Sequence, residues 1–100
     1  MSTIEIARFP GDAARLEAVI RGHLGDLQTM TEYARSIGCL HHRFAARSHE
    51  ILLIEEWQDI AEAVTKFWYP PEGMRLMREA RVQPPVEVSH YRSLTDPTEF

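Results

Sequence analysis

The chain has 100 residues, of which 44% are hydrophobic and 26% are charged, and its formal net charge is −4. This length and composition predict one soluble globular domain with a single modest core. The eleven basic residues are scattered, which argues against a nucleic-acid partner. The one cysteine, Cys39, excludes an internal disulfide and a multi-cysteine metal site. No segment resembles a secretory leader or reaches the length of a membrane span, so we expect a cytoplasmic protein with no membrane partner.

The chain begins with a predicted strand followed by a predicted helix. Residues 3–9 alternate Ile4 and Ile6 with Glu5 and Ala7, as a strand does, and a Pro-Gly pair stops them. Asp12 is a suitable N-cap for the helix that follows.

Residues 13–37 carry apolar side chains at spacings of three and four, which predicts one amphipathic helix with a single face to bury. Gly22 and Gly25 each weaken a helix by about 1 kcal/mol relative to alanine, so a bend or break is allowed there. Gly38 is the natural residue at the end of this helix. The apolar stripe consists of Leu16, Ile20, Leu24, Leu27, Met30, Ala34 and Ile37.

Residues 39–47 and 50–57 are rich in β-forming side chains and are separated by Ser48-His49, which predicts an antiparallel hairpin. Side chains alternate across a sheet, so the neighbouring His41 and His42 point to opposite faces. A loop centred between Ser48 and His49 determines which residues of the two strands lie opposite each other. The pairs on one face are Arg47/Glu50, Ala45/Leu52, Arg43/Ile54 and His41/Glu56. The pairs on the other face are Ala46/Ile51, Phe44/Leu53, His42/Glu55 and Leu40/Trp57.

Both faces of this hairpin carry apolar side chains, and a chain of this length supplies helices for only one. We therefore expect the second face to be a subunit interface. The predicted homodimer contact is the face that carries His41, Arg43, Leu52 and Ile54, where charged pairs would set the register of the two subunits.

A second helix is predicted from Asp59, as N-cap, to Phe67, and two prolines at positions 70 and 71 interrupt it. A further helical piece over residues 72–81 and a last strand over residues 86–92 complete the chain. The order is β-α-β-β-α-β, which predicts the α+β ferredoxin-like fold, a four-stranded antiparallel sheet with its helices on one face. Residues 1–92 form the single domain, and the tail, residues 93–100, either frays or contacts a partner subunit.

Two local patterns carry a resemblance to a known family. The first helix ends in Ser36-Ile37-Gly38-Cys39-Leu40, with a Gly-Cys pair opening the next strand, and the third strand ends in Glu55-Glu56-Trp57 directly before a capped helix. Over residues 3–92 the chain thereby resembles the antibiotic biosynthesis monooxygenase-like domains of the dimeric α/β-barrel superfamily.

The resemblance implies a homodimer whose sheets pack face to face, with a pocket between sheet and helices in each subunit. Members include cofactor-independent oxygenases of electron-rich aromatic substrates and haem-degrading enzymes. The chain departs from the pattern at Lys66-Phe67-Trp68, where the family often has a histidine. Residues 3–9 also lack the asparagine of the haem-degrading branch, and no histidine follows Trp68, so haem degradation is not expected.

The strongest candidate for chemistry is His42 opposite Glu55. A histidine held by a carboxylate in an apolar cavity can accept a proton from a substrate. The alternative is that His42 and Glu55 form a structural cross-strand pair, in which each side chain serves only as the hydrogen-bond partner of the other. The predicted pocket residues are Trp57, Phe44, Leu40, His23, Trp68 and Tyr33, although such side chains are often only core.

No cofactor and no metal are expected. His41 and His42 diverge and His49 lies in a turn, so with His90 they make no metal site. Cys39 has nothing nearby to make its thiol reactive. The predicted function is that of a cofactor-independent monooxygenase for a small aromatic quinol or phenol. The alternative is a dimeric protein of the same fold, either a non-catalytic binder of small ligands or a stress-response accessory, because a fold alone does not decide function.

Overall fold

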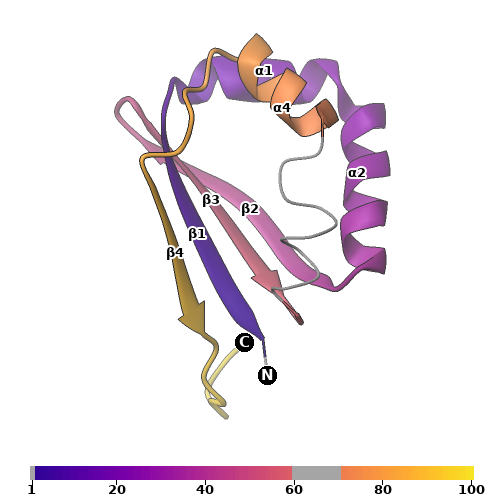
Figure 1. Cartoon of the computed structure of the whole chain (residues 1–100), viewed down its shortest axis with the longest axis vertical. Coiled ribbons are helices and arrows are strands. Elements are labelled where there is room, and N and C mark those ends of the chain that lie inside the picture. Colours follow the sequence, from indigo (N-terminus) through magenta and orange to yellow (C-terminus); the bar gives the residue numbers. More distant parts are fainter. Residues whose placement is uncertain (1, 60–70) are drawn as a thin grey trace.

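The computed structural model describes residues 2–59 and 71–100. Four strands form one antiparallel sheet in the order β2-β3-β1-β4. The described helices all lie on the same face of this sheet (Figure 1). The predicted α+β ferredoxin-like architecture is therefore confirmed. The elements are β1 (Thr3–Pro10), α1 (Ala13–Gly22), α2 (Leu24–Ser36), β2 (Cys39–Arg47), β3 (Glu50–Trp57), α4 (Pro71–Glu79) and β4 (Glu87–Arg92).

The core lies between the sheet and the helices and contains two clusters. In β1 the buried positions alternate, with Glu5, Ala7 and Phe9 turned inward, so Ile4 and Ile6 belong to the opposite face. The larger cluster consists of Ala7, Phe9, Leu16, Ile51, Ala80 and Val82, and the smaller one of Ala34, Cys39 and Trp57.

The hairpin of β2 and β3 has the predicted two-residue turn, in which His49 adopts a positive φ of 61°. The predicted pairing is confirmed from Arg47/Glu50 to His41/Glu56. The predicted pair Leu40/Trp57 is wrong, because an irregularity between Cys39 and His41 places Cys39 opposite Trp57. The extra residue changes the phase of the alternation, so Cys39 is buried while Leu40 is 48% exposed.

The helix predicted over residues 13–37 is broken at the place that Gly22 and Gly25 allowed, because His23 separates α1 from α2. Its φ of −133° lies outside the helical range, and α1 ends at Gly22 directly before it. Figure 1 shows the consequence: α1 crosses one end of the sheet and α2 turns down along it. The predicted N-cap is confirmed, since the Asp12 carboxylate accepts hydrogen bonds from the backbone N–H groups of Ala14 and Arg15 at 2.8 and 3.3 Å.

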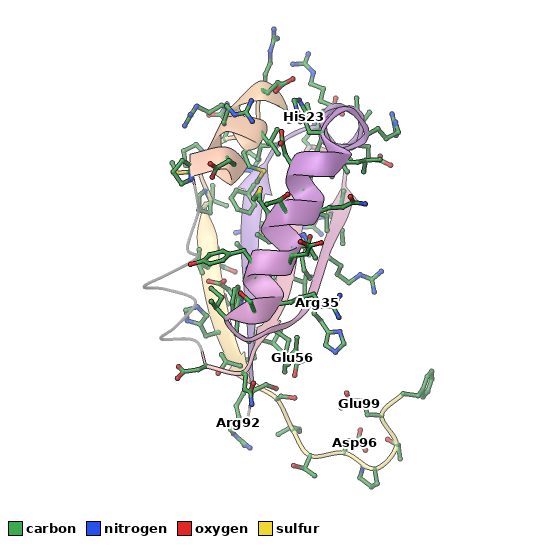
Figure 2. The ribbon with its side chains drawn as sticks, turned by 90° about the vertical axis from the view of Figure 1, so that its right-hand side faces the viewer. His23, Arg35, Glu56, Arg92, Asp96 and Glu99 are labelled. Carbon is green, nitrogen blue, oxygen red and sulfur yellow. The ribbon has the colours of Figure 1, made fainter. Side chains whose placement is uncertain are left out.

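The second half of the chain agrees with the predicted order, although α4 and β4 are each slightly shorter than expected. The predicted helix of residues 60–67 and the candidate pocket residue Trp68 lie outside the described residues. The tail beyond Arg92 leads away from the domain, as the positions of Asp96 and Glu99 show in Figure 2. Leu94 is 66% exposed, and a partner contact for this tail stays a prediction. Of the described helices, none has the length and hydropathy needed to span a membrane.

We expect Gly38→Ala to destabilise the fold by roughly 1–3 kcal/mol, because residue 38 has a φ of 109°, which L-residues rarely adopt. Among the described residues, a Cβ there would meet only the Gln58 Cβ, at an ordinary 3.6 Å, so the cost comes from the backbone. Gly25→Ala, inside α2, is the matched control: its Cβ would meet no atom of residues 2–59 and 71–100 within 4 Å, and the change should stabilise the fold by up to about 1 kcal/mol. Urea unfolding measures both, and equal stabilities would contradict the argument.

Candidate functional site

A cavity of about 430 Å³ lies between the sheet and the helices. This volume is in the range of small-molecule sites. The helices contribute apolar walls, and the inward face of the sheet forms a floor that contains ionisable groups. The helical wall residues include Leu16, Val19, Ile20, Leu27, Met30, Leu76 and Met77.

The predicted pair is present at this floor. The His42 Nδ1 lies 2.9 Å from a carboxylate oxygen of Glu55. Glu55 is 7% exposed and also accepts a hydrogen bond from the Trp57 indole N–H at 3.4 Å. The His42 ring packs edge-on against Phe44, with ring centroids 5.2 Å apart. The carboxylate and the phenyl ring together fix the imidazole, which leaves Nε2 as the nitrogen that a ligand can meet.

Two further residues on the inward face of the sheet, one of them lining the cavity, were missed by the sequence reasoning. Glu5 of β1 lies opposite Glu55 in the sheet, and His90 of β4 lies opposite Glu5. The His90 Nε2 is 3.1 Å from a Glu5 carboxylate oxygen. With His42 they form a row across all four strands, His42–Glu55–Glu5–His90, which we call the His-Glu-Glu-His row.

The row places two carboxylates next to each other in a buried layer. Burial raises the pKa of Glu5 above its ordinary 4.5, and the negative charge of Glu55 raises it further, whereas the hydrogen bond and charge of His90 act in the opposite direction. Glu5 is only 4% exposed. The spacing of Glu5 along the strand could have identified it. Glu5 lies two residues before Ala7 and four before Phe9, and residues at even spacings in a strand share a face, so Glu5 lies on the core face with them.

Cys39 also lines the cavity. Burial, followed by the negative charge of Glu55, raises the pKa of its thiol to about 11. The thiol is therefore protonated at neutral pH and is a poor nucleophile, in agreement with the expectation from the sequence.

The remaining predicted pocket residues divide between the cavity and other parts of the structure. Trp57, Phe44 and Leu40 line the cavity. Tyr33 is 46% exposed and, like His23, is not among the lining residues. Trp68 lies outside the described residues.

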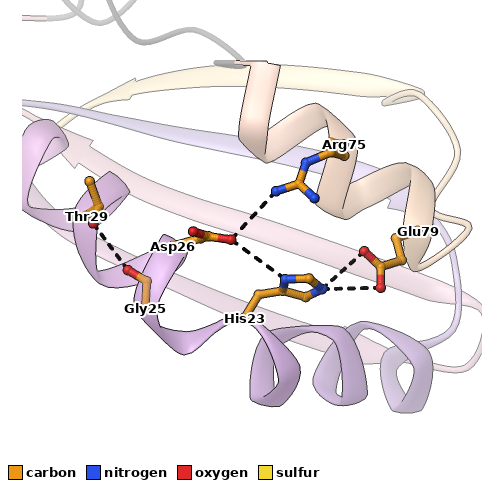
Figure 3. Close-up of polar contacts among 6 residues, drawn as sticks. All are labelled: His23, Gly25, Asp26, Thr29, Arg75 and Glu79. Carbon is orange, nitrogen blue, oxygen red and sulfur yellow. Dashed lines mark hydrogen bonds and ion pairs between the residues drawn. The ribbon is translucent and has the colours of Figure 1, made fainter.

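His23 instead occupies the corner between α1 and α2, as Figure 3 shows. Its Nε2 lies 3.1 Å from Glu79 of α4, and its Nδ1 lies 3.8 Å from Asp26. Arg75 of α4 is 3.6 Å from the same Asp26. These contacts connect α4 to the start of α2, and the His23 ring points towards α4.

The opposite face of the sheet carries His41, whose Nε2 lies 3.9 Å from Glu56. His41 and His42 thus have different partners on different faces. Within residues 2–59 and 71–100, no three His, Cys, Asp or Glu side chains are grouped so that they could hold a metal ion. The chemistry available at the cavity floor is proton transfer by imidazole and carboxyl groups.

Comparison with known proteins gives a result for structure but none for sequence. No protein-family model matches the chain, and no curated protein matches its sequence. Among solved structures, a protein from Bordetella bronchiseptica assigned by name to the antibiotic biosynthesis monooxygenases is 16% identical with a TM-score of 0.65, over 94% of this chain and 98% of that one.

Two further solved structures are named as oxygenases. SnoaB of Streptomyces nogalater, a cofactor-independent oxygenase, is 14% identical with a TM-score of 0.62 over 98% of each chain. The monooxygenase ActVA-Orf6 of Streptomyces coelicolor, solved with the ligand nanaomycin D, is 16% identical with a TM-score of 0.60, over 97% of this chain and 93% of that one. The chain therefore shares the fold of these solved structures, and at identities of 14% to 16% this likeness concerns the fold alone.

Proposed function

We propose that the protein is a cofactor-independent monooxygenase of a small aromatic quinol or phenol. The observation that carries this proposal is the His42–Glu55 pair at the floor of a mostly apolar cavity. A cavity that only binds an apolar ligand needs no titratable pair, whereas deprotonation of a phenol requires a positioned base. In this assignment His42 is the base and Glu55 orients it.

The proposed reaction needs only the substrate, molecular oxygen and a base. His42 accepts the phenolic proton at Nε2, and Glu55 stabilises the imidazolium that results. The phenolate is electron-rich and donates electrons to oxygen, so that a carbon–oxygen bond forms at a ring carbon. That carbon becomes a carbonyl, and its hydrogen, the phenolic proton held by His42 and the second oxygen atom leave together as water. Trp57, Phe44 and Leu40 would contact the ring and exclude bulk water.

The comparisons support this choice of reaction. SnoaB is named as a cofactor-independent oxygenase, and ActVA-Orf6 holds nanaomycin D, so the same fold accommodates both the reaction and a small ligand.

The buried Cys39, the one cysteine of the chain, is compatible with a reducing cytoplasm as the compartment.

Oxygen uptake with a panel of quinols and phenols in chelator-treated buffer tests the proposal. We expect the wild type to consume oxygen and His42→Ala to be slower by about 10²–10⁴-fold, the usual contribution of a general base. His49→Asn is the matched control, because His49 lies in the exposed turn and asparagine tolerates its positive φ, so uptake should be unchanged.

Two outcomes would contradict this assignment. Equal rates for wild type and His42→Ala would remove His42 as the base. Binding of aromatic ligands without oxygen uptake for any of them would favour the alternative function, a non-catalytic small-ligand binder.

We also propose that the protein is a homodimer through the outer sheet face, defined by Ile4, Ile6, His41, Arg43, Leu52, Ile54 and Tyr91. The described helices all cover the opposite face (Figure 1). Tyr91 is 56% exposed, and the isoleucines and Leu52 are only half-buried. A sheet face with partly exposed apolar side chains is typical of a subunit interface, and the charged residues spread through this face, such as His41, Arg43 and Glu56, would set the register of the two subunits.

Size-exclusion chromatography with light scattering tests the dimer. The wild type should elute as a dimer at micromolar concentration, and Ile54→Arg should shift it to a monomer because a charge would be buried in the contact. Gln28→Arg adds the same charge on the exposed side of α2 and should leave the dimer intact. A monomeric wild type would contradict the proposal.

A further inference from the structure

The cavity floor contains a second carboxyl group that the proposed base does not use. Glu5 lines the cavity and is 4% exposed. Its register partner is Glu55, so the two side chains lie on neighbouring strands of the same face, about 4.5–5.5 Å apart at their Cβ atoms. A buried acidic group in contact with a cavity is either a structural ion pair or a proton donor.

Burial and the charge of Glu55 raise the pKa of Glu5 above its ordinary value, although the hydrogen bond from His90 lowers it in part. Its ionisable neighbours in the sheet are Glu55 on β3 and His90 on β4, and beyond Glu55 lie His42 and Cys39 on β2. Arg35 of α2 is exposed at the cavity wall, whereas the described wall residues of α1 and α4 carry no charge. Burial is the largest influence on Glu5 and raises its pKa, and the charge of Glu55 adds to this effect.

We propose that Glu5 is the general acid of the same site, and that His90 is a positioning residue that holds the Glu5 carboxyl group and connects it to the surface. This inference rests on the proposed monooxygenase function. The base and the acid then occupy the two halves of the His-Glu-Glu-His row. Two carboxyl groups in one site take opposite roles when their surroundings differ, and here Glu55 is held by the His42 imidazole and the Trp57 indole N–H, whereas Glu5 is held by His90.

The acid completes the proton balance of the reaction. His42 removes the phenolic proton, and oxygen adds to a ring carbon to give a peroxide anion. Glu5 protonates this anion to the hydroperoxide, and the resulting carboxylate then takes the proton of the same ring carbon while the O–O bond breaks. The hydroxide that leaves takes the proton from His42. Phenol and oxygen thus become quinone and water, and both residues return to their initial states.

His90 can serve as the route to solvent because its side chain is 47% exposed while Glu5 is buried. Its Nε2 lies 3.1 Å from the Glu5 carboxyl group, within hydrogen-bond distance. His90 is not among the residues that line the cavity and acts through Glu5, which is why it is a positioning residue and not a catalytic one.

The first test needs no substrate. The carboxyl carbon of Glu5, assigned by its loss in Glu5→Gln, is followed by NMR through a pH titration of the full-length protein. The pKa of Glu5 should exceed 4.5 in the wild type, should fall in Glu55→Gln, and should rise further in His90→Leu, because Glu55 raises it and His90 lowers it. A wild-type value at or below 4.5, or shifts of the same sign in both variants, would overturn the inference.

The second test uses turnover. A general acid must be protonated, so wild-type activity should decline as the pH rises through the pKa of Glu5, and Glu5→Gln should lose this alkaline decline together with about 10²-fold or more in rate. In Glu5→Gln the hydroperoxide of the substrate, formed by addition of oxygen without loss of any atom, should accumulate in place of quinone, which lowers the quinone formed per oxygen consumed. Glu17→Gln, at an exposed position of α1, is the matched control and should behave as wild type.

The two tests separate the failure of this inference from the failure of the proposed function. Wild-type turnover with an unchanged pH profile and unchanged quinone yield in Glu5→Gln would overturn the acid role while leaving His42 as the base. No turnover with any substrate would overturn the function and with it the acid role, whatever the titration shows about Glu5.

Discussion

The structure depends on one constraint, the alignment of β1 with β3 that places Glu5 beside Glu55 on the face covered by helices. Two neighbouring carboxylates in a layer of low polarity repel each other and lose their hydration. The fold accommodates them because each outer strand supplies a histidine at the same level, His42 on β2 and His90 on β4. The same register of β1 with its neighbours therefore aligns the strands and brings together the four residues of the His-Glu-Glu-His row.

The helices complete the site by leaving space above this row. The break at His23 lets α2 descend along the sheet while α1 remains across its end, and the contacts of His23 and Asp26 with α4 hold the third described helix near the corner (Figure 3). A straight helix over residues 13–37 would direct its second half away from the sheet. The space of the cavity thus results from the break between α1 and α2, and its ionisable groups come from the inward face of the sheet.

The sequence predicted the hairpin register and the His42–Glu55 pair because a two-residue turn determines every pair that follows it. The predicted pairing was wrong at Leu40, because the strand propensity of the local sequence does not indicate the irregularity between Cys39 and His41. The sequence allowed a break at Gly22 or Gly25 but did not decide between a broken and a continuous helix, because the apolar spacing of three and four continues past Gly22. Glu5 and His90 were missed because they are 85 residues apart and meet only when β4 pairs with β1.

The sequence by itself determined the order of the elements, the N-cap at Asp12 and the local pairing of β2 with β3, because these depend on interactions between near neighbours. Only the tertiary structure decided which side of β1 faces the helices and which residues meet across the sheet. The alternation of β1 is compatible with either side, and burial of Phe9 against Ile51 and Leu16 selects the side that also buries Glu5. Long-range packing therefore made an ordinary acidic residue part of the site.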